Sequence, residues 1–263
     1  MTKTILVTGA TDGIGLATAT RFAEDGHHVL IHGRNARKAE VVARDLEASA
    51  GSTHVYIGDF SRIDEVERLA ADIGREHERL DVLINNAGIF KTSEPTTPAG
   101  LDVRFVVNTL APYVLTERLL PLLGATGRVV NLSSAAQAPV DLRALSGATR
   151  LSDMDAYAQS KLALTMWSRN MGLAHKNGPT VVAVNPGSLL ATKMVKEAFG
   201  QSRGGVEVGA DILYRAAVSD EFADANGLYF DNDVGRFSDP HPDALNLEKT
   251  SAVLNAMQEL LSS

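Results

Sequence analysis

Tyr157 and Lys161 carry the chemistry that the sequence indicates most directly. They stand four residues apart in Tyr157-Ala158-Gln159-Ser160-Lys161, a spacing that puts both on one face of a helix. A free tyrosine has a pKa of about 10, and a neighbouring ammonium lowers that pKa by favouring the phenolate. The pair predicts a tyrosine that exchanges a proton with a bound ligand. Two such residues also occur by chance on helix surfaces.

Two serines and an asparagine are further candidates for the same site. Ser133 and Ser134 follow the apolar segment Val129–Leu132, where a hydroxyl can donate to a carbonyl oxygen and stabilise its developing charge. Chemistry alone does not choose between them. Asn108 lies within the apolar segment Val106–Leu110, where a buried amide needs partners. It is either a site residue or a satisfied amide of the core.

A glycine-rich turn, Thr8–Gly15, follows the first apolar segment and precedes the helical segment Leu16–Glu24. Glycine has no Cβ, so the backbone can approach a ligand closely, and the N–H groups that begin a helix face phosphates. We expect this turn to bind the pyrophosphate of a dinucleotide; an ordinary turn is the alternative. The candidate binding residues are Gly9, Thr11, Asp12, Gly13, Ile14 and Gly15.

The segment after the second apolar run indicates which dinucleotide binds. Val29–Ile31 leads into Arg34 and Arg37 with no carboxylate between residues 32 and 38. A carboxylate there would bind the ribose 2′-hydroxyl of NAD, whereas a guanidinium can bind a 2′-phosphate. Cations at the start of a helix also oppose its dipole, so a bound phosphate is the better explanation for the two arginines. We therefore expect NADP(H), bound by Arg34 and secondly by Arg37, although solvated surface cations would look the same.

Short apolar segments that alternate with helical ones must position these residues. Runs of this kind suit strands covered on both faces. The pattern predicts an α/β fold, a single doubly wound parallel sheet (Rossmann fold) of about seven strands with helices on both faces, in one domain over 1–263. The strands are expected at Ile5–Val7, Val29–Ile31, Val55–Ile57, Val82–Ile84, Val129–Leu132, Val181–Val184 and Gly227–Phe230.

Two long irregular segments, 135–155 and 188–207, follow predicted strands. Ligands bind beyond the carboxyl ends of strands in such sheets, so we expect both segments to be substrate loops. Their apolar residues are candidates for a substrate pocket, with ordinary loop packing as the alternative. These residues are Ala138, Pro139, Val140, Leu189, Leu190, Met194, Val195 and Phe199.

In combination these motifs resemble those of the short-chain dehydrogenase/reductase family. The turn at Thr8–Gly15 is similar to T-G-x-x-x-G-x-G, the segment 85–88 reads N-N-A-G, and Tyr157-x-x-x-Lys161 and the P-G pair at 186–187 follow in the family's order. The long Ser134–Tyr157 spacing and an expected C-terminal helix over Leu245–Leu261 resemble the retinol dehydrogenase and WW-domain oxidoreductase branch.

The resemblance implies an NADP(H)-dependent oxidoreductase that transfers hydride between nicotinamide and a carbonyl or alcohol. Tyr157 would be the acid and base, Ser134 would hold the substrate oxygen, Lys161 would orient the ribose, and Asn108 would hold a water that links Lys161 to solvent. Asp59 would lie near the adenine. Further cofactor contacts are implied at Phe60, Asn86, Ala87, Gly88, Pro186, Gly187 and Thr192.

Two functions of other kinds remain open at this point. A non-catalytic dinucleotide-sensing regulatory protein would keep the glycine turn without needing the serine, tyrosine and lysine in register. A nucleotide-sugar epimerase or dehydratase shares the Tyr-x-x-x-Lys pair but is usually longer than the 263 residues of this chain.

The composition and charge of the chain disfavour a nucleic-acid partner, a metal site and a membrane span. The net charge is −7, from 25 Lys and Arg against 32 Asp and Glu, which disfavours a nucleic-acid partner. There is no cysteine, and His27, His28 and His241 form no spacing typical of a metal site. No apolar run approaches the roughly 20 residues of a membrane helix, and the chain begins directly with a strand. We expect no membrane span, a cytoplasmic location, and a homo-oligomer only as a family tendency.

Overall fold

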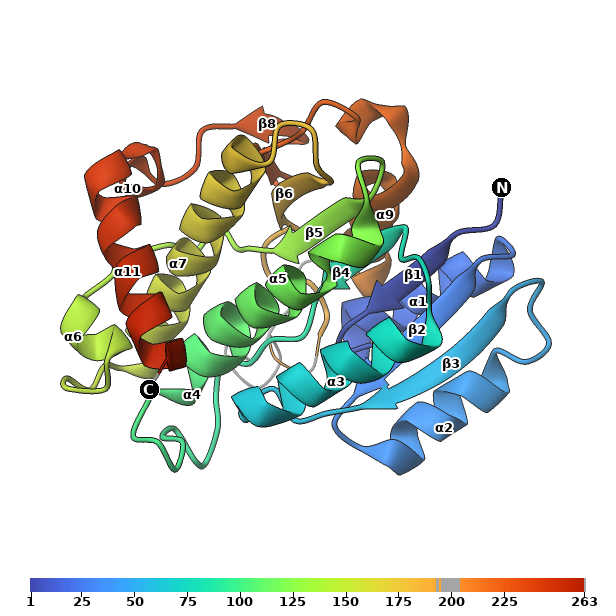
Figure 1. Ribbon diagram of the computed structural model, residues 1–263, viewed down its shortest axis with the longest axis horizontal. Coiled ribbons are helices and arrows are strands. Elements are labelled where there is room, and N and C mark those ends of the chain that lie inside the picture. Colours follow the sequence, from blue (N-terminus) through green and yellow to red (C-terminus); the bar gives the residue numbers. More distant parts are fainter. Residues whose placement is uncertain (193, 195–203, 263) are drawn as a thin grey trace.

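In the part of the chain that the structure describes, residues 1–192, 194 and 204–262, eight strands form one sheet. The structure is a computed structural model. The sheet order is β3-β2-β1-β4-β5-β6-β7-β8 (Figure 1), and every neighbouring pair is parallel except β7 and β8. The strands are β1 (Thr4–Val7), β2 (His28–Gly33), β3 (Ser52–Ile57), β4 (Val82–Asn85), β5 (Arg128–Leu132), β6 (Thr180–Asn185), β7 (Tyr229–Asp231) and β8 (Arg236–Ser238).

This order confirms the doubly wound sheet expected from the sequence. The chain runs outward from β1 to β3 and then crosses to β4 on the other side of β1, which leaves a crevice at the carboxyl ends of β1 and β4. The eighth strand, β8, was not expected. It pairs antiparallel with β7 through a short hairpin.

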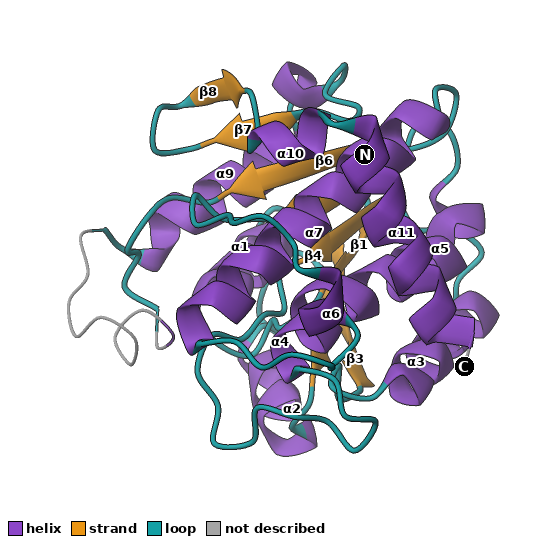
Figure 2. Cartoon of the chain, turned by 90° about the vertical axis from the view of Figure 1, so that its left-hand side faces the viewer, coloured by secondary structure: helices purple, strands orange, loops and turns teal. Residues whose placement is uncertain are grey.

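Helices cover both faces of the sheet (Figures 1 and 2). Leu6, Leu30 and Leu83 face α3, α5, α7 and α11, whereas Ile5, Val29 and their neighbours face α1, α2 and α9. The helices are α1 (Gly13–Glu24), α2 (Ala36–Asp45), α3 (Ile63–Glu76), α4 (Val103–Phe105), η1 (Val106–Leu110), α5 (Ala111–Leu123), α6 (Leu142–Leu145), α7 (Asp153–Ala174), α9 (Val206–Val218), η2 (Asp220–Phe222), α10 (Pro242–Leu245) and α11 (Leu247–Ser262).

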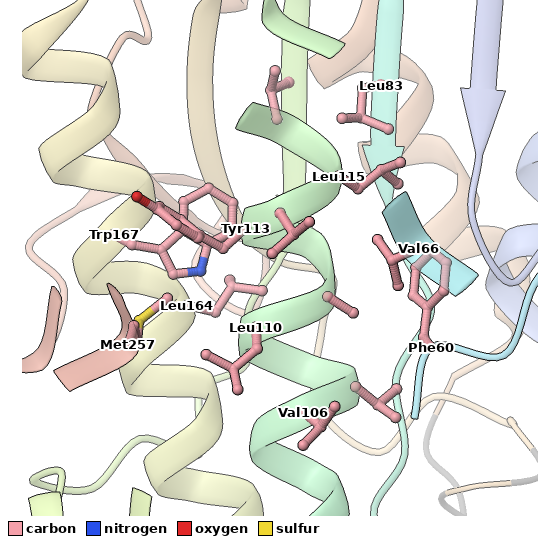
Figure 3. Packing of buried hydrophobic residues seen from close by; sticks show 14 of the residues in the cluster. Phe60, Val66, Leu83, Val106, Leu110, Tyr113, Leu115, Leu164, Trp167 and Met257 are labelled. Carbon is pink, nitrogen blue, oxygen red and sulfur yellow. The ribbon is translucent and has the colours of Figure 1, made fainter. Parts of the chain in front are cut away.

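The larger core cluster holds α7 against the sheet. Figure 3 shows Trp167 of α7 close to Tyr113 of α5, and their ring centroids lie 5.6 Å apart in an edge-to-face arrangement. Met257 of α11 joins the same cluster. Aromatic side chains of this size contribute much of the apolar area that a core buries. The helix that bears Tyr157 and Lys161 is therefore fixed along its buried length.

Several element boundaries differ from the sequence predictions. The expected C-terminal helix is divided into α10 and α11 because the backbone of Asn246 is extended, with φ −88° and ψ 112°. In the segment 135–155, α6 interrupts the loop and α7 already begins at Asp153, where Ser152 accepts a hydrogen bond from the Asp155 N–H.

No helix among the described residues combines the length and the apolar character needed to cross a membrane.

Candidate active site

The predicted catalytic residues come together where β5 ends and α7 passes it. Ser134 follows β5 by two residues, and Tyr157 lies in the second turn of α7. The phenol of Tyr157 forms a hydrogen bond with Ser134, and its ring packs edge-to-face on Phe90, with the centroids 5.1 Å apart. The spacing of the sequence motifs therefore becomes direct contact in three dimensions.

Burial has the largest effect on the pKa of Tyr157. It raises the pKa of the phenol above its usual value, and the hydrogen bond with Ser134 acts in the opposite direction. The lowered pKa expected from the sequence is therefore not a property of the protein by itself. Desolvation disfavours the charged phenolate more than the neighbouring groups of the chain favour it.

Lys161 lies one turn further along α7 with its side chain buried. Its Nζ donates a hydrogen bond of 2.6 Å to the Leu132 carbonyl at the end of β5, and the same atom lies 5.7 Å from the centre of the Tyr157 ring. Burial lowers the pKa of this ammonium to about 8. Near neutral pH, Lys161 is therefore protonated at a pH close to its pKa. Its ammonium lies near the Tyr157 ring.

The two serines after β5 have different surroundings. The Ser133 hydroxyl is buried and lies 2.6 Å from the Thr165 hydroxyl, so it joins β5 to α7. The Ser134 hydroxyl accepts from the Ala136 N–H at 3.1 Å and bonds with Tyr157. Of the two, only Ser134 is in hydrogen-bonding contact with the phenol. The role of substrate-binding serine stays a prediction.

The Ser134 main chain is held by two residues that the sequence patterns did not indicate. The Ser134 carbonyl accepts from Gln137 Nε2 at 2.9 Å and from the Tyr229 hydroxyl at 3.2 Å. Tyr229 lies on β7, almost 100 positions away in the chain, with its side chain buried. Only the packing of β7 beside β6 brings it to Ser134, and no local motif marks it.

Asn108 is fully buried in the π-helical turn η1. Its Oδ1 accepts from the Ile89 N–H at 2.8 Å, and its Nδ2 donates to the Ile89 carbonyl and to the Ser160 hydroxyl, both at 3.0 Å. The side chain thus joins the loop after β4 to α7, as a satisfied core amide would. Single π-helical turns are frequent at functional sites, and the water-holding role of Asn108 stays a prediction.

The glycine turn packs against the end of β4. Gly9 has φ +65°, and a Cβ there would lie 2.9 Å from Ala87 Cα. Asn86 Nδ2 donates to the carbonyls of Thr8 and Gly9 at 2.8 and 3.2 Å. Asn86 is therefore a brace between β1 and β4, and Gly15, in the first turn of α1, lies against its amide.

The glycine turn lies next to Thr192 at Gly13. Gly13 has φ +56°, and the nearest atom to a Cβ added there would be Thr192 Cγ2, at 3.7 Å. Asp12 begins α1 by accepting from the Gly13 N–H at 2.7 Å. Thr11 contacts Gly33, and Ile14 contacts Gly209. The N-terminus of α1 therefore lies next to Thr192, and such a helix N-terminus suits a pyrophosphate.

Arg34 and Arg37 lie at the end of β2 and in the first turn of α2, both exposed. Neither forms an ion pair with another described residue, whereas Arg21, Arg62 and several other arginines do. Nearby, Asp59 Oδ1 accepts from the Ser61 N–H at 2.9 Å. The buried ring of Phe60 stacks on His32, with their centroids 4.2 Å apart. Neither contact reveals what Asp59 binds.

Carboxylates shape the turn that follows β6. Gly187 has φ +120° and donates to Asn185 Oδ1 at 3.3 Å, while Asn185 Nδ2 donates to Asp231 and Asp233. Burial favours the neutral acid of Asp233, but hydrogen bonds from Ser188 and Asn185 outweigh it and lower its pKa. This network fixes Pro186 and Gly187. In the loop after β4, Gly88 lies next to Asn108 and Lys161.

The residues expected to line an apolar pocket belong only in part to the described residues. Leu190 is buried against Gly187 and Gly209, and Val140 packs on the larger core cluster, so both pack as ordinary loop residues do. Leu189 adopts φ +56°, which is rare for a leucine and marks a sharp turn into the loop. Val195 and Phe199 lie outside the described residues.

A sequence model of the family described as short chain dehydrogenase matches residues 3–203. The chain belongs to the short-chain dehydrogenase family. Retinol dehydrogenase 13 from Homo sapiens is 33% identical over 251 residues, which cover 87% of this chain and 76% of that protein. The family and the retinol dehydrogenase branch expected from the motifs are thereby confirmed.

Solved structures agree with this assignment. An uncharacterized protein from Mycobacterium Paratuberculosis superposes with a TM-score of 0.80 at 28% identity and covers 99% of this chain and 94% of its own. A short-chain dehydrogenase from Burkholderia cenocepacia J2315, solved in complex with NADP, has a TM-score of 0.70 at 27% identity, with coverages of 89% and 97%. The family consists of oxidoreductases that use nicotinamide dinucleotides.

Proposed function

We propose that this short-chain dehydrogenase interconverts a small-molecule carbonyl compound and the corresponding alcohol with NADP(H), using Tyr157 as acid and base. One observation carries the proposal. The Tyr157 phenol bonds with Ser134 above a buried Lys161, at the same sheet edge as the glycine turn. Acid, oxygen-binding hydroxyl and cation are thus together beside a phosphate-binding turn.

The residues present suit a dinucleotide. A Cβ at Gly13 would lie at the start of α1, 3.7 Å from Thr192 Cγ2, and the N–H groups that begin a helix bind phosphate oxygens. Arg34 and Arg37 are available for a 2′-phosphate. When bound, the nicotinamide group supplies or accepts the hydride, and the protein supplies position and charge.

Tyr157 and Ser134 act on the substrate oxygen. In the reducing direction, the carbonyl carbon gains the hydride and its oxygen gains the phenolic proton of Tyr157, while Ser134 donates a hydrogen bond to that oxygen. In the oxidising direction, the phenolate takes the proton from the alcohol. Lys161 stabilises the phenolate by its charge, as any ammonium within about 6 Å does.

The choice of NADP(H) rests on charge. No carboxylate occupies residues 32–38, and the two arginines there have no ion-pair partner among the described residues. A guanidinium binds phosphate through paired hydrogen bonds. The relative from Burkholderia cenocepacia J2315 was solved with NADP, which supports the same choice.

Nucleotide titration followed by turnover tests the proposal. Wild-type protein, Tyr157→Phe and Tyr214→Phe are titrated with NADPH and NADH, and oxidation of NADPH is then followed with a panel of aldehydes, ketones and quinones. Tyr214, which stacks on Phe22, serves as a matched control that loses a phenol outside the site. We expect tighter binding of NADPH than of NADH, and turnover abolished only in Tyr157→Phe.

Three outcomes would count against the proposal. Absence of binding to either nucleotide would exclude a dinucleotide enzyme. Turnover in Tyr157→Phe that stays within about tenfold of wild type would exclude the assigned acid. Tight nucleotide binding without turnover on any carbonyl or alcohol would favour the dinucleotide-sensing alternative.

A further inference from the structure

His32 is a buried histidine at the end of β2 that belongs to none of the motifs above. Its side chain is 3% exposed, and both ring nitrogens are used. The Gly9 N–H donates to Nδ1 at 3.3 Å, and Nε2 lies 3.0 Å from the Gly58 carbonyl. One face of the ring stacks on Phe60, with 4.2 Å between centroids and 21° between planes.

These contacts define the protonation state of the ring. Nδ1 accepts a hydrogen bond from a backbone N–H, so the proton of the neutral ring must be on Nε2, where it is donated to the Gly58 carbonyl. Burial lowers the pKa of His32 to about 4, against smaller opposing effects of Gly58 and Asp59. The imidazole is therefore neutral near pH 7 and satisfies one donor and one acceptor at once.

The ring joins the segments that the proposed function places around the adenosine half of the cofactor. Gly9 belongs to the glycine turn after β1, Gly58 directly precedes Asp59 after β3, and His32 itself is two residues before Arg34. Asn86 braces the same turn from the β4 side through the carbonyls of Thr8 and Gly9. His32 braces it from the β2 and β3 side, through the Gly9 N–H.

We propose that His32 is a positioning residue that sets the spacing between the glycine turn and the Gly58–Phe60 segment, and thereby the affinity for the adenosine half of NADP(H). The proposal rests on the proposed function, because it requires that a dinucleotide binds at this edge. His32 ends β2, whereas Tyr157 lies on α7, which packs on β5 and β6. The strands β1 and β4 separate these two positions in the sheet. A change at His32 should therefore alter nucleotide affinity and leave the chemical step unchanged.

Three variants separate this role from a general effect on folding. His32→Phe keeps the ring and its stacking but removes both hydrogen bonds, and His32→Gln keeps one donor and one acceptor. His28→Phe is the matched control, since His28 lies at the opposite end of β2, where its ring contacts Ser52. Each is titrated with NADPH, with 2′,5′-ADP for the adenosine half and with nicotinamide mononucleotide for the other half.

We expect His32→Phe to raise the Kd for NADPH and for 2′,5′-ADP by roughly five- to thirtyfold, as for the loss of one or two hydrogen bonds. The Kd for nicotinamide mononucleotide and the kcat at saturating NADPH should stay within about twofold of wild type. His32→Gln should recover part of the affinity, and His28→Phe should bind like wild type. An unchanged Kd for 2′,5′-ADP in folded His32→Phe, or a lower kcat at unchanged KM, would overturn the proposal.

A measurement on the wild-type protein covers the case in which His32→Phe does not fold. The imidazole signals of His32 are followed by NMR while 2′,5′-ADP or nicotinamide mononucleotide is added. We expect the Nε2-protonated neutral form, with signals that shift on addition of 2′,5′-ADP only. His32 signals that do not shift at saturating 2′,5′-ADP would overturn the inference. If wild type binds neither 2′,5′-ADP in this titration nor NADPH in the one above, the proposed function is wrong and so is the role of His32.

Discussion

At the scale of single residues, Tyr157 is the sharpest test of the chemistry. General acid–base catalysis contributes roughly 10²- to 10⁴-fold to a rate, so Tyr157→Phe should lower kcat/KM by that range. The phenol bonds with Ser134 and not with the glycine turn. The Kd for NADPH should therefore change by less than about threefold, as measured by nucleotide fluorescence. A parallel loss of binding would indicate a structural role.

Lys161 gives a prediction about stability and pH. Its pKa is about 8 in the native protein and 10.5 as the ordinary value, so between these values the unfolded chain holds a proton that the native protein has lost. Stability therefore rises with pH from about 8 to 10.5, by on the order of 3 kcal/mol in total. This contribution is lost again as the pH falls through 8.

Comparison of the wild-type protein with Lys161→Met isolates this effect, because methionine has no titrating ammonium. Urea unfolding of both proteins at a series of pH values should show the free energy of unfolding of wild type rising relative to the variant above pH 8. Parallel curves would mean that the ammonium is not desolvated. Lys161→Met should also lose turnover, because the cation beneath the phenol is removed.

At the scale of elements, the glycine turn depends on the backbone of Gly13. A side chain at φ +56° costs roughly 1 kcal/mol, and its Cβ would lie at the start of α1, 3.7 Å from Thr192 Cγ2. Gly13→Val should therefore lower the Tm slightly and weaken NADPH binding by well over tenfold. Gly74→Val is the control, since a Cβ at Gly74 meets nothing within 4 Å. Equal NADPH affinity in both variants would contradict a binding role for the turn.

A buried ion-pair network ties the segment before η1 to the start of α7. The Arg104 side chain is 2% exposed and pairs with Asp102 at 2.6 Å and with Asp153. Removing one partner of a buried pair leaves an uncompensated charge, at a cost of about 3–5 kcal/mol. Asp153 is half exposed, so we expect about 2–3 kcal/mol for Arg104→Leu. The exposed Arg118–Glu67 pair provides the control: Arg118→Leu should cost less than about 1 kcal/mol.

At the scale of the whole molecule, the segment from 204 onward completes the fold. The family match ends at residue 203, yet Leu213 and Phe230 fill one core and Met257 fills the other. A chain cut after residue 203 would expose both faces to water, and each large buried side chain contributes about 1.5–3 kcal/mol. We expect it to lack a cooperative thermal transition by circular dichroism, and a cooperative transition would contradict this.

Much of the fold and part of the candidate site could be predicted from the sequence, because they depend on local patterns. Buried parallel strands appear as short runs such as Val29–Ile31, and a glycine turn must be contiguous to cradle a phosphate. Tyr157 and Lys161 can be paired because helix geometry relates residues four apart. A polar residue at the end of an apolar strand is also a signal in the sequence. It would have indicated His32 as well as Asn85 and Asn185.

The sequence by itself determined the order of elements, the family and the residues that could do chemistry. Only the tertiary structure decided which hydroxyl meets Tyr157, since Ser133 and Ser134 are alike in the chain but Ser133 bonds with Thr165 and Ser134 with Tyr157. It also brought Tyr229 and Gln137 to the Ser134 carbonyl, and His32 to Gly9. The physical reason is the same in each case: residues distant in the chain meet only when neighbouring strands pack side by side, and burial then sets the pKa of Lys161, Tyr157 and His32.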